Sequence, residues 1–434
     1  MAFVHQLSCE GIKSELDLFS LPTTQTSIEH AQWVEHQPVA SIGTGGPIEF
    51  LLPGSGDHYL DLANTYLFVK AHVVRGDGGN LPPDAPVGPV NNWMHSLFSQ
   101  VDVSLNGTLV TPSTNTYAYR AYIETLLSHG VEAKTSQLTS ELWYKDTAGH
   151  MDATNDDNKG LLKRKGYVAS SRIVDMMGRL HVDLFFQDRY LLNGVDVKIR
   201  LVQNKNAFAL MAGGANPDFK ISIDEAILFA RKAKLNPAVQ MGHVKALEKG
   251  TAKYPLRRVH CKVFSIPRGA MSHTHENVYL GVLPKRVVLC CVDNDAYNGT
   301  FAKNPFHAKH NKLNFLALYV DGQQVPAKPL QPKFGADGTY VRSYLNLFAG
   351  TGKVFQDEGN DITRQEFAEG YTLFAFDITP DCCDGPHFNL VHKGNLRVEM
   401  HFDDPLEQTV NVIVYGEFES VLEIDRNRNV VYDY

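Results

Sequence analysis

The sequence predicts an all-β protein in which two antiparallel sandwiches follow one another, accompanied by a few short helices. Short segments that alternate apolar and polar residues recur along the chain, and clusters of glycine, proline and asparagine separate them. Both halves of the chain also show the same order of elements. With 434 residues, 43% of them hydrophobic and 21% charged, the chain has a globular composition and enough length for more than one core.

The clearest strand signal lies in the first half. Residues 101–105 alternate apolar and polar side chains and run into Asn106-Gly107, the pair that most strongly favours a two-residue hairpin turn. We therefore predict a strand, a turn and a second strand. The same reasoning predicts further strands at 66–74, 179–185, 195–202, 220–229, 258–266, 278–283, 286–292, 313–320, 372–377, 396–402 and 409–422.

Helix signals are few. One helix is predicted to begin near Thr116 and to stop at Gly130. A second follows Asn236-Pro237, where a capping residue precedes a proline at the first helical position, and ends at Gly250. Lysine and arginine are concentrated around this second helix, at 231–258. We interpret it as the connector between the two halves.

An internal repeat of elements supports two similar sandwiches. Asn106-Gly107 in the first half and Asp321-Gly322 in the second each follow an alternating segment and precede a proline-containing turn and a helix-like stretch. The alternating pattern of residues 196–201 recurs at 395–400, and a long final strand is predicted after each segment. Two sandwiches of about eight strands, each with a helix inserted after a hairpin, form a tandem jelly roll.

This repeat sets the predicted organisation of the chain: an all-β double jelly roll, in five segments. They are an N-terminal arm (1–44), a first jelly roll (45–232), a linker (233–254), a second jelly roll (255–425) and a C-terminal tail (426–434).

Charge and apolar run length exclude several classes of protein. Lysine and arginine number 41 against 48 acidic residues, a net charge of −7, which disfavours a protein that coats nucleic acid. The longest apolar runs, such as 287–292, are far below the roughly 20 residues of a membrane span. Residues 1–11 lack the pattern of a secretory signal, so we expect the chain to stay inside the cell that makes it.

Motifs that would carry chemistry are weak. The pairs His273/His275 and His307/His310 have spacings that a metal site could use, but no convincing helix would place both rings on one face. The glycines of 43–47 lack the lysine and hydroxyl residue of a phosphate loop. Six cysteines, including the adjacent pairs 290–291 and 382–383, are too few for a disulfide framework. We predict no catalytic residues, no cofactor, no metal and hence no enzyme.

Several long strings of residues are specific enough to suggest a family. They are LFSQVDVSLNG at 97–107, LWYKDTAGH at 142–150, LFFQDRYLL at 184–192, KSELDLF at 13–19, QTSI at 25–28 and PIEF at 47–50. In these strings the chain resembles the major capsid protein of Polinton (Maverick) elements and adintoviruses. The resemblance runs from near the start of the chain to its last strand, more weakly after Ser272.

The resemblance implies a structural protein of a double-stranded DNA virus, or of an integrated element that encodes one. Such proteins form homotrimers whose six jelly rolls make a pseudo-hexagonal capsomer of an icosahedral virion, assembled inside the host cell. Partners would be neighbouring capsomers, penton proteins and minor capsid proteins, without strong direct binding of nucleic acid. Loops at 76–89 and 148–160 are modest, so we expect a smooth exterior. Trp93, Phe306 and Phe334 are candidates for contact with a neighbour, although packing in one core is the favoured alternative.

Two other classes of function stay open from the sequence. A double jelly roll can also be a carbohydrate-binding module or an amidase, because a fold does not decide a function. A domesticated, non-viral scaffolding protein is the other alternative. The three tryptophans, Trp33, Trp93 and Trp143, are widely separated, which disfavours a carbohydrate-binding face.

Overall fold

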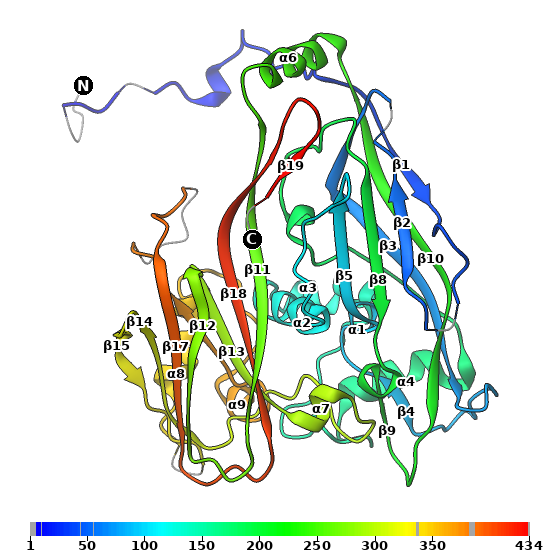
Figure 1. Ribbon diagram of the computed structural model, residues 1–434, viewed down its shortest axis with the longest axis vertical. Helices are drawn as coiled ribbons and strands as arrows, with labels where there is room; N and C mark the ends of the chain where they lie inside the picture. Colours follow the sequence, from blue (N-terminus) through cyan, green and yellow to red (C-terminus); the bar gives the residue numbers. More distant parts are fainter. Residues whose placement is uncertain are drawn as a thin grey trace.

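The computed structural model describes residues 6–9, 11–43, 45–54, 56–335, 338–381 and 387–432. Two sandwiches lie side by side (Figure 1). The first half of the chain forms the sandwich on the right, and the second half forms the one on the left. An N-terminal arm extends away from both, and helix α6 (Pro237–Leu247) joins them at the top.

Four-stranded antiparallel sheets build each sandwich. In the first half, one sheet has the order β1-β10-β3-β7 and the other β2-β8-β5-β6. Their bounds are β1 Ile28–His36, β10 Phe219–Leu235, β3 His58–Arg75, β7 Val174–Gly178, β2 Ile48–Leu52, β8 Val197–Gln203, β5 Phe98–Leu105 and β6 Thr108–Leu109. Two short strands, β4 (Val87–Pro89) and β9 (Leu210–Ala212), pair separately.

The second half repeats this arrangement. Its sheets have the orders β11-β18-β13-β16 and β12-β17-β14-β15, and the short β19 (Val430–Val431) pairs with β18. The bounds are β11 Ala252–Ile266, β18 Val410–Ile424, β13 Arg286–Asp293, β16 Leu373–Asp377, β12 Ser272–Val282, β17 Lys393–Phe402, β14 Leu313–Val320 and β15 Gln323–Leu330.

Both halves share one topology. With β4, β9 and β19 set aside, the described strands of either half, counted in chain order, pair as 1-8-3-6 in one sheet and as 2-7-4-5 in the other. This is the pattern of a jelly roll, because each sheet alternates strands from the two ends of the unit. The predicted fold class, an all-β double jelly roll, is confirmed.

The repeat extends to individual side chains in the two hairpins. Asn106 and Gly107 have φ of 47° and 83°, and Asp321 and Gly322 have 48° and 82°, the left-handed pair of a type I′ turn. In the first hairpin the backbone N–H of Asp196 donates to the Asn106 side chain at 2.8 Å. The equivalent bond, from Asn395 to the Asp321 carboxylate, is also 2.8 Å. Each turn is therefore tied to the strand beside its hairpin.

Gly107→Ala is expected to lower the free energy of unfolding by about 1–2 kcal/mol, measured by urea denaturation. A Cβ at this position would meet no atom within 4 Å, so the cost comes from the left-handed backbone alone. The matched control is Gly166→Ala, which also adds a Cβ in open space but lies inside a helix, where alanine stabilises by up to about 1 kcal/mol. Equal effects at both positions would contradict the argument.

The predicted helices appear close to the positions that the sequence indicates. Helix α2 (Tyr117–Ser128) begins after Thr116, and α8 (Val341–Gly350) occupies the same place between the fifth and sixth strands of the second jelly roll. In α6 the Asn236 side chain accepts the Ala238 N–H at 2.9 Å. The other helices are η1 Ser14–Leu16, α1 Trp93–Ser96, α3 Val131–Thr135, η2 Gln137–Glu141, α4 Lys159–Val168, η3 Ala169–Ser171, η4 Asp183–Phe186, α5 Asn206–Ala209, α7 Asn294–Asn298 and α9 Arg364–Ala368.

Two sequence predictions need correction. The strand expected at 179–185 is wrong, because β7 ends at Gly178 and a 3-10 turn (η4) occupies Asp183–Phe186. Its alternation arises from polar residues buried beside apolar ones, since His181 and Asp183 are buried too. Segment 1–44 is also more than an arm, because β1 lies within it. This edge strand pairs with β10 and exposes polar residues, so its apolar pattern is weak.

Large aromatic side chains fill the cores. Trp93, Phe306 and Phe334 are all buried within one chain, which corrects their candidacy as contacts with a neighbour. One apolar cluster fills the first sandwich. The other fills the second sandwich and continues into the first through α2. Within the described part of the chain, no helix has both the length and the apolar character required to cross a bilayer.

Candidate functional site

The contact between the two jelly rolls contains stacked aromatic rings and buried polar networks. Helix α2 lies in it, between β5 of the first roll and the β11 and β18 strands of the second (Figure 1). Ten of its twelve residues are buried. This burial follows from its composition, because the helix carries tyrosines and aliphatic side chains on nearly all sides.

Aromatic rings from both rolls stack on α2. The Tyr122 ring lies parallel to that of Phe306, with centroids 4.1 Å apart and planes at 4°, and stacks on Trp143 with its centroid at 5.4 Å. One helical turn earlier, Tyr119 stacks on Tyr297 at 5.5 Å. Phe306 and Tyr297 belong to the second jelly roll. The rings therefore join the two units through face-to-face contacts that large buried side chains favour.

The second roll presents the outer face of one sheet to α2. Cys261, Ile413 and Tyr415 share that face, since Cys261 pairs with Tyr415 and alternate residues of a strand point to the same side. Tyr415 donates its hydroxyl to Glu124 of α2 at 3.3 Å. The opposite face carries Phe418, whose ring contacts Tyr279 of β12 inside the second roll. This sheet is thus covered on both faces, once by its own roll and once by the first.

A buried group of charged residues sits at the edge of this contact. Arg120 donates to Glu124 at 2.9 Å and to Asp183 at 2.6 Å, and His181 lies 2.5 Å from Glu124. The Asp183 carboxylate also accepts the backbone N–H of Val259 in the second roll at 3.2 Å. The ion pairs lie within the first roll, and their carboxylates accept the hydrogen bonds from Val259 and Tyr415 that connect the units.

The pKa values of this group follow from competition between burial and pairing. Burial alone would raise the pKa of Glu124, but Arg120 and His181 outweigh it and lower that pKa to about 2. Burial dominates at Asp183 and raises its pKa in spite of Arg120. Burial also lowers the pKa of His181, although Glu124 opposes this. The charges of this buried group are therefore stabilised by one another and not by water.

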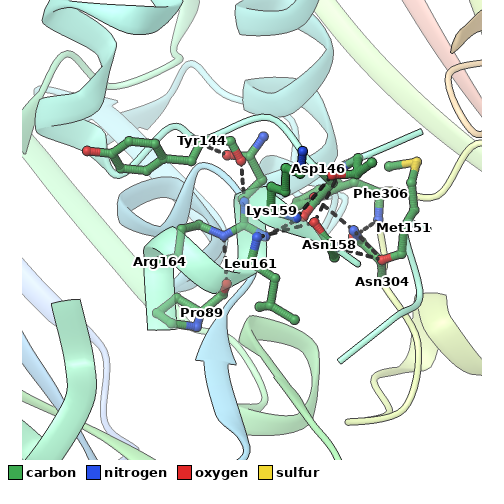
Figure 2. A network of polar contacts seen from close by, with 12 residues as sticks. Pro89, Tyr144, Asp146, Met151, Asn158, Lys159, Leu161, Arg164, Asn304 and Phe306 are labelled. Atoms are coloured by element: carbon green, nitrogen blue, oxygen red, sulfur yellow. Dashed lines mark hydrogen bonds and ion pairs between the residues drawn. The ribbon is translucent and has the colours of Figure 1, made fainter. Parts of the chain in front are cut away.

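A second network connects the rolls on the other side of α2. Figure 2 shows Arg164 of α4 beside Asp146, with Nη2 and Oδ1 2.5 Å apart and both side chains fully buried. Arg164 also donates to the carbonyls of Pro89, at 2.8 Å, and of Tyr144. The second oxygen of Asp146 accepts from Asn304 of the second roll at 2.9 Å. A single carboxylate thus links both jelly rolls.

Neighbouring amides complete this network. Asn158 caps α4 by accepting the Leu161 N–H at 3.2 Å and donates to the Met151 carbonyl at 3.3 Å. Asn304 donates to the same carbonyl at 3.2 Å and accepts the Phe306 N–H at 3.0 Å. The stretch from 146 to 158 therefore packs into the contact between the rolls.

The histidine and cysteine motifs have structural roles. His275 stacks on Phe264 with centroids 4.1 Å apart, His310 stacks on Phe334 at 4.2 Å, and His307 contacts Asp152 at 2.8 Å. Among the described residues, no three histidine, cysteine or acidic side chains gather as a metal site would require. Cys290 and Cys291 are buried free thiols, as expected, whereas the pair at 382–383 and Thr44 of the glycine-rich segment lie outside the described residues.

Acidification from pH 7 to pH 5 is expected to destabilise the chain through its half-buried histidines. Burial first, then neighbouring cations, lowers the pKa of His260 and of His310 to about 4. The unfolded chain takes up these protons from about pH 6.5 downward while the folded chain resists, so stability falls as the pH falls toward 4. After allowance for solvent screening, the two rings together account for about 2 kcal/mol at pH 5.

The measurement is urea unfolding at both pH values, compared with the variant H260Q/H310Q. That variant is expected to show a smaller loss of stability on acidification. The cations that face these rings, Lys262 and Arg258 for His260 and Lys312 for His310, stay in place. An unchanged difference between the two pH values would assign the acid sensitivity to other groups.

Comparison with known proteins relates this fold to others. No family model matches the sequence. The uncharacterized protein F54H12.2 of Caenorhabditis elegans is 27% identical over 426 residues, covering 95% of this chain and 99% of that protein. Among solved structures, a chain of the Sputnik virophage is 14% identical and matches with a TM-score of 0.70 over 100% of this chain and 94% of its own.

A second solved structure, the Faustovirus major capsid protein, is 9% identical, with a TM-score of 0.58 over 94% of this chain and 92% of that one. These likenesses span whole chains, so they include both jelly rolls and the contact between them. This chain therefore has the double jelly-roll fold, and its structural neighbours are major capsid proteins of viruses.

Proposed function

We propose that this chain is the major capsid protein of a double-stranded DNA virus or virus-like mobile element, forming homotrimeric, pseudo-hexagonal capsomers that tile an icosahedral shell. The observation that carries the proposal is the full-length likeness to viral capsid structures, in which both jelly rolls and their connection match together. In this proposal the chain is a structural protein that acts by binding its neighbours through complementary surfaces, and not by catalysis. Its partners are neighbouring capsomers, penton proteins and minor capsid proteins.

Within this class we assign the chain to the Polinton (Maverick) and adintovirus type. The sequence strings at 97–107 and 142–150 support this assignment. The nearly full-length match to a nematode protein supports an element carried in an animal genome. Location in the virion, after assembly inside the host cell, follows from the same proposal.

The internal geometry supports a ring of three chains. Two jelly rolls of one topology lie side by side and are joined by buried aromatic and charged contacts, so each chain supplies two similar units in a fixed relation. Head-to-tail contacts between such chains close into a ring when the rotation permits. Three chains then supply six similar corners.

The test is light scattering on the purified chain at micromolar concentration, followed by negative-stain microscopy. The expected result is a trimer that survives dilution and appears as triangular or hexagonal particles, since obligate interfaces bury more than roughly 2,000 Å². A stable monomer would contradict the proposal and favour a lectin-like or enzymatic role.

We also propose that the chain does not coat the genome by itself. With a net charge of −7, it releases few counterions from phosphates. Filter binding with duplex DNA at physiological ionic strength tests this, and tight, salt-sensitive binding would contradict it.

A further inference from the structure

Helices α2 and α8 occupy the same place in their two jelly rolls but differ in burial. Each follows the hairpin of the fourth and fifth strands and precedes the sixth. Helix α2 buries ten of its twelve residues, whereas α8 buries Ser343, Leu347 and Gly350 out of ten. Helix α2 lies against the second jelly roll, whereas α8 packs on β16 of its own roll, the left-hand one in Figure 1. The loop that follows α8 reaches the first roll, where Lys353 donates to the Ser128 carbonyl at 3.0 Å.

The uncovered side of α8 is apolar. Val341 and Leu345 lie one helical turn apart, so they share a face, and their side chains are 44% and 52% exposed. The loop after the helix adds Val354, 38% exposed, and Phe355, 98% exposed. Apolar side chains that stay exposed on one helix face and in the loop that follows it are candidates for an interaction site. We call these residues the α8 surface.

The sheet that corresponds to the partner of α2 lies in the first jelly roll. In the second roll, the outer face of β11-β18-β13 lies against α2 through Cys261, Tyr415 and their neighbours. The equivalent strands of the first roll are β1, β10 and β3, which form the right-hand side of Figure 1. Their outer face has no counterpart of α2 in the same chain among the described elements.

That outer face carries aromatic side chains. The rings of Phe68 and Phe229 meet edge to face with centroids 6.4 Å apart, and Ile227 and Tyr66 adjoin them in the register of β10 and β3. Among the described residues, the two apolar cores do not include these four side chains, whereas Leu67, Val69 and Leu228 on the inner face belong to the core of the first roll. We call the four residues the β3/β10 surface.

We propose that the α8 surface of one copy packs on the β3/β10 surface of a second copy, repeating between chains the contact that α2 makes within one chain. The two surfaces differ and belong to different jelly rolls, so the contact is head to tail. Because the repeated contact relates each jelly roll to the next by the same geometry, it continues around a ring. The inference rests on the proposed capsomer and names the surfaces that would hold it together.

The experiment uses two charged variants of the full chain, Leu345→Glu on the α8 surface and Phe68→Glu on the β3/β10 surface. Leu345 is 52% exposed and Phe68 lies on the outer face of β3, and circular dichroism is used to check that each variant is folded. Light scattering at micromolar concentration is expected to show trimers for the unmodified chain and at least tenfold weaker association for each variant. The matched control is Met241→Glu on α6, another exposed apolar residue on a helix, 62% exposed, which is expected to leave the trimer intact.

Mixing the two variants tests that the two surfaces are partners. Leu345→Glu retains an intact β3/β10 surface, and Phe68→Glu retains an intact α8 surface. An equimolar mixture is therefore expected to form open heterodimers that neither variant forms alone. This result also proves that both variants are folded, because each must supply a working surface.

The outcomes separate this inference from the proposed function. If the unmodified chain is a trimer but both variants still form trimers, or the mixture stays monomeric, the named surfaces are wrong and the capsomer stands. If the unmodified chain is a monomer, the proposed function and this inference both fail.

Discussion

Asp146→Ala is expected to lower the free energy of unfolding by about 3–5 kcal/mol. The substitution leaves the Arg164 guanidinium fully buried without its counter-ion, and it removes the acceptor of the Asn304 amide. An uncompensated buried charge costs far more than the pair itself contributes. Urea denaturation, followed by tryptophan fluorescence, measures the change.

An exposed ion pair provides the control. Lys70 and Glu225 are 2.6 Å apart but about 40% exposed, so Glu225→Ala is expected to cost less than about 1 kcal/mol. Asp146→Leu combined with Arg164→Met is expected to regain most of the lost stability, because apolar side chains of similar volume can replace a buried pair. A small effect of Asp146→Ala alone would show that water reaches Arg164.

Phe306→Ala is expected to cost about 3–5 kcal/mol, because it removes a buried ring from the contact between the two jelly rolls. Leu280→Ala is the control, since that side chain is 73% exposed and its loss is expected to change stability by less than about 0.5 kcal/mol. Urea denaturation of both variants gives the comparison.

A double-mutant cycle isolates the ring pair. Tyr122→Ala and Phe306→Ala, alone and together, are expected to show a coupling free energy of about 0.5–1.5 kcal/mol, as stacked rings do. Additive effects would mean that the two rings act through separate neighbours and that their parallel geometry contributes nothing of its own.

Local chemistry accounts for what could be predicted from the sequence. Asn106-Gly107 and Asp321-Gly322 could be recognised because left-handed backbone conformations restrict the residues that turns accept. Asn236-Pro237 likewise marked the start of α6. These signals repeat in order along the chain, so they reveal the two jelly rolls before any contact between them is known.

The contact between the rolls could not be predicted in the same way. Asp146 and Asn304 are far apart in the sequence, and neither stands in a recognisable motif. The segment 179–185 alternates apolar and polar residues, which is also the pattern of a strand, so it was misassigned. Its polar residue Asp183 is in fact buried because it pairs with Arg120, and the sequence does not show that contact. Position 146 does lie within the string at 142–150 that carries the family resemblance, and this was the available signal.

The order of the strands along the chain also determines when the protein can fold as it emerges from the ribosome. β1 pairs with β10, so the first jelly roll cannot close until residue 235 has been synthesised, and such distant pairing slows folding. Tyr119 and Tyr122 also contact Phe208 and Trp143 of the first half, but they lack their partners Tyr297 and Phe306 until those residues have been synthesised. A nascent chain halted just after α6 is therefore expected to expose part of this aromatic surface and to be prone to aggregation.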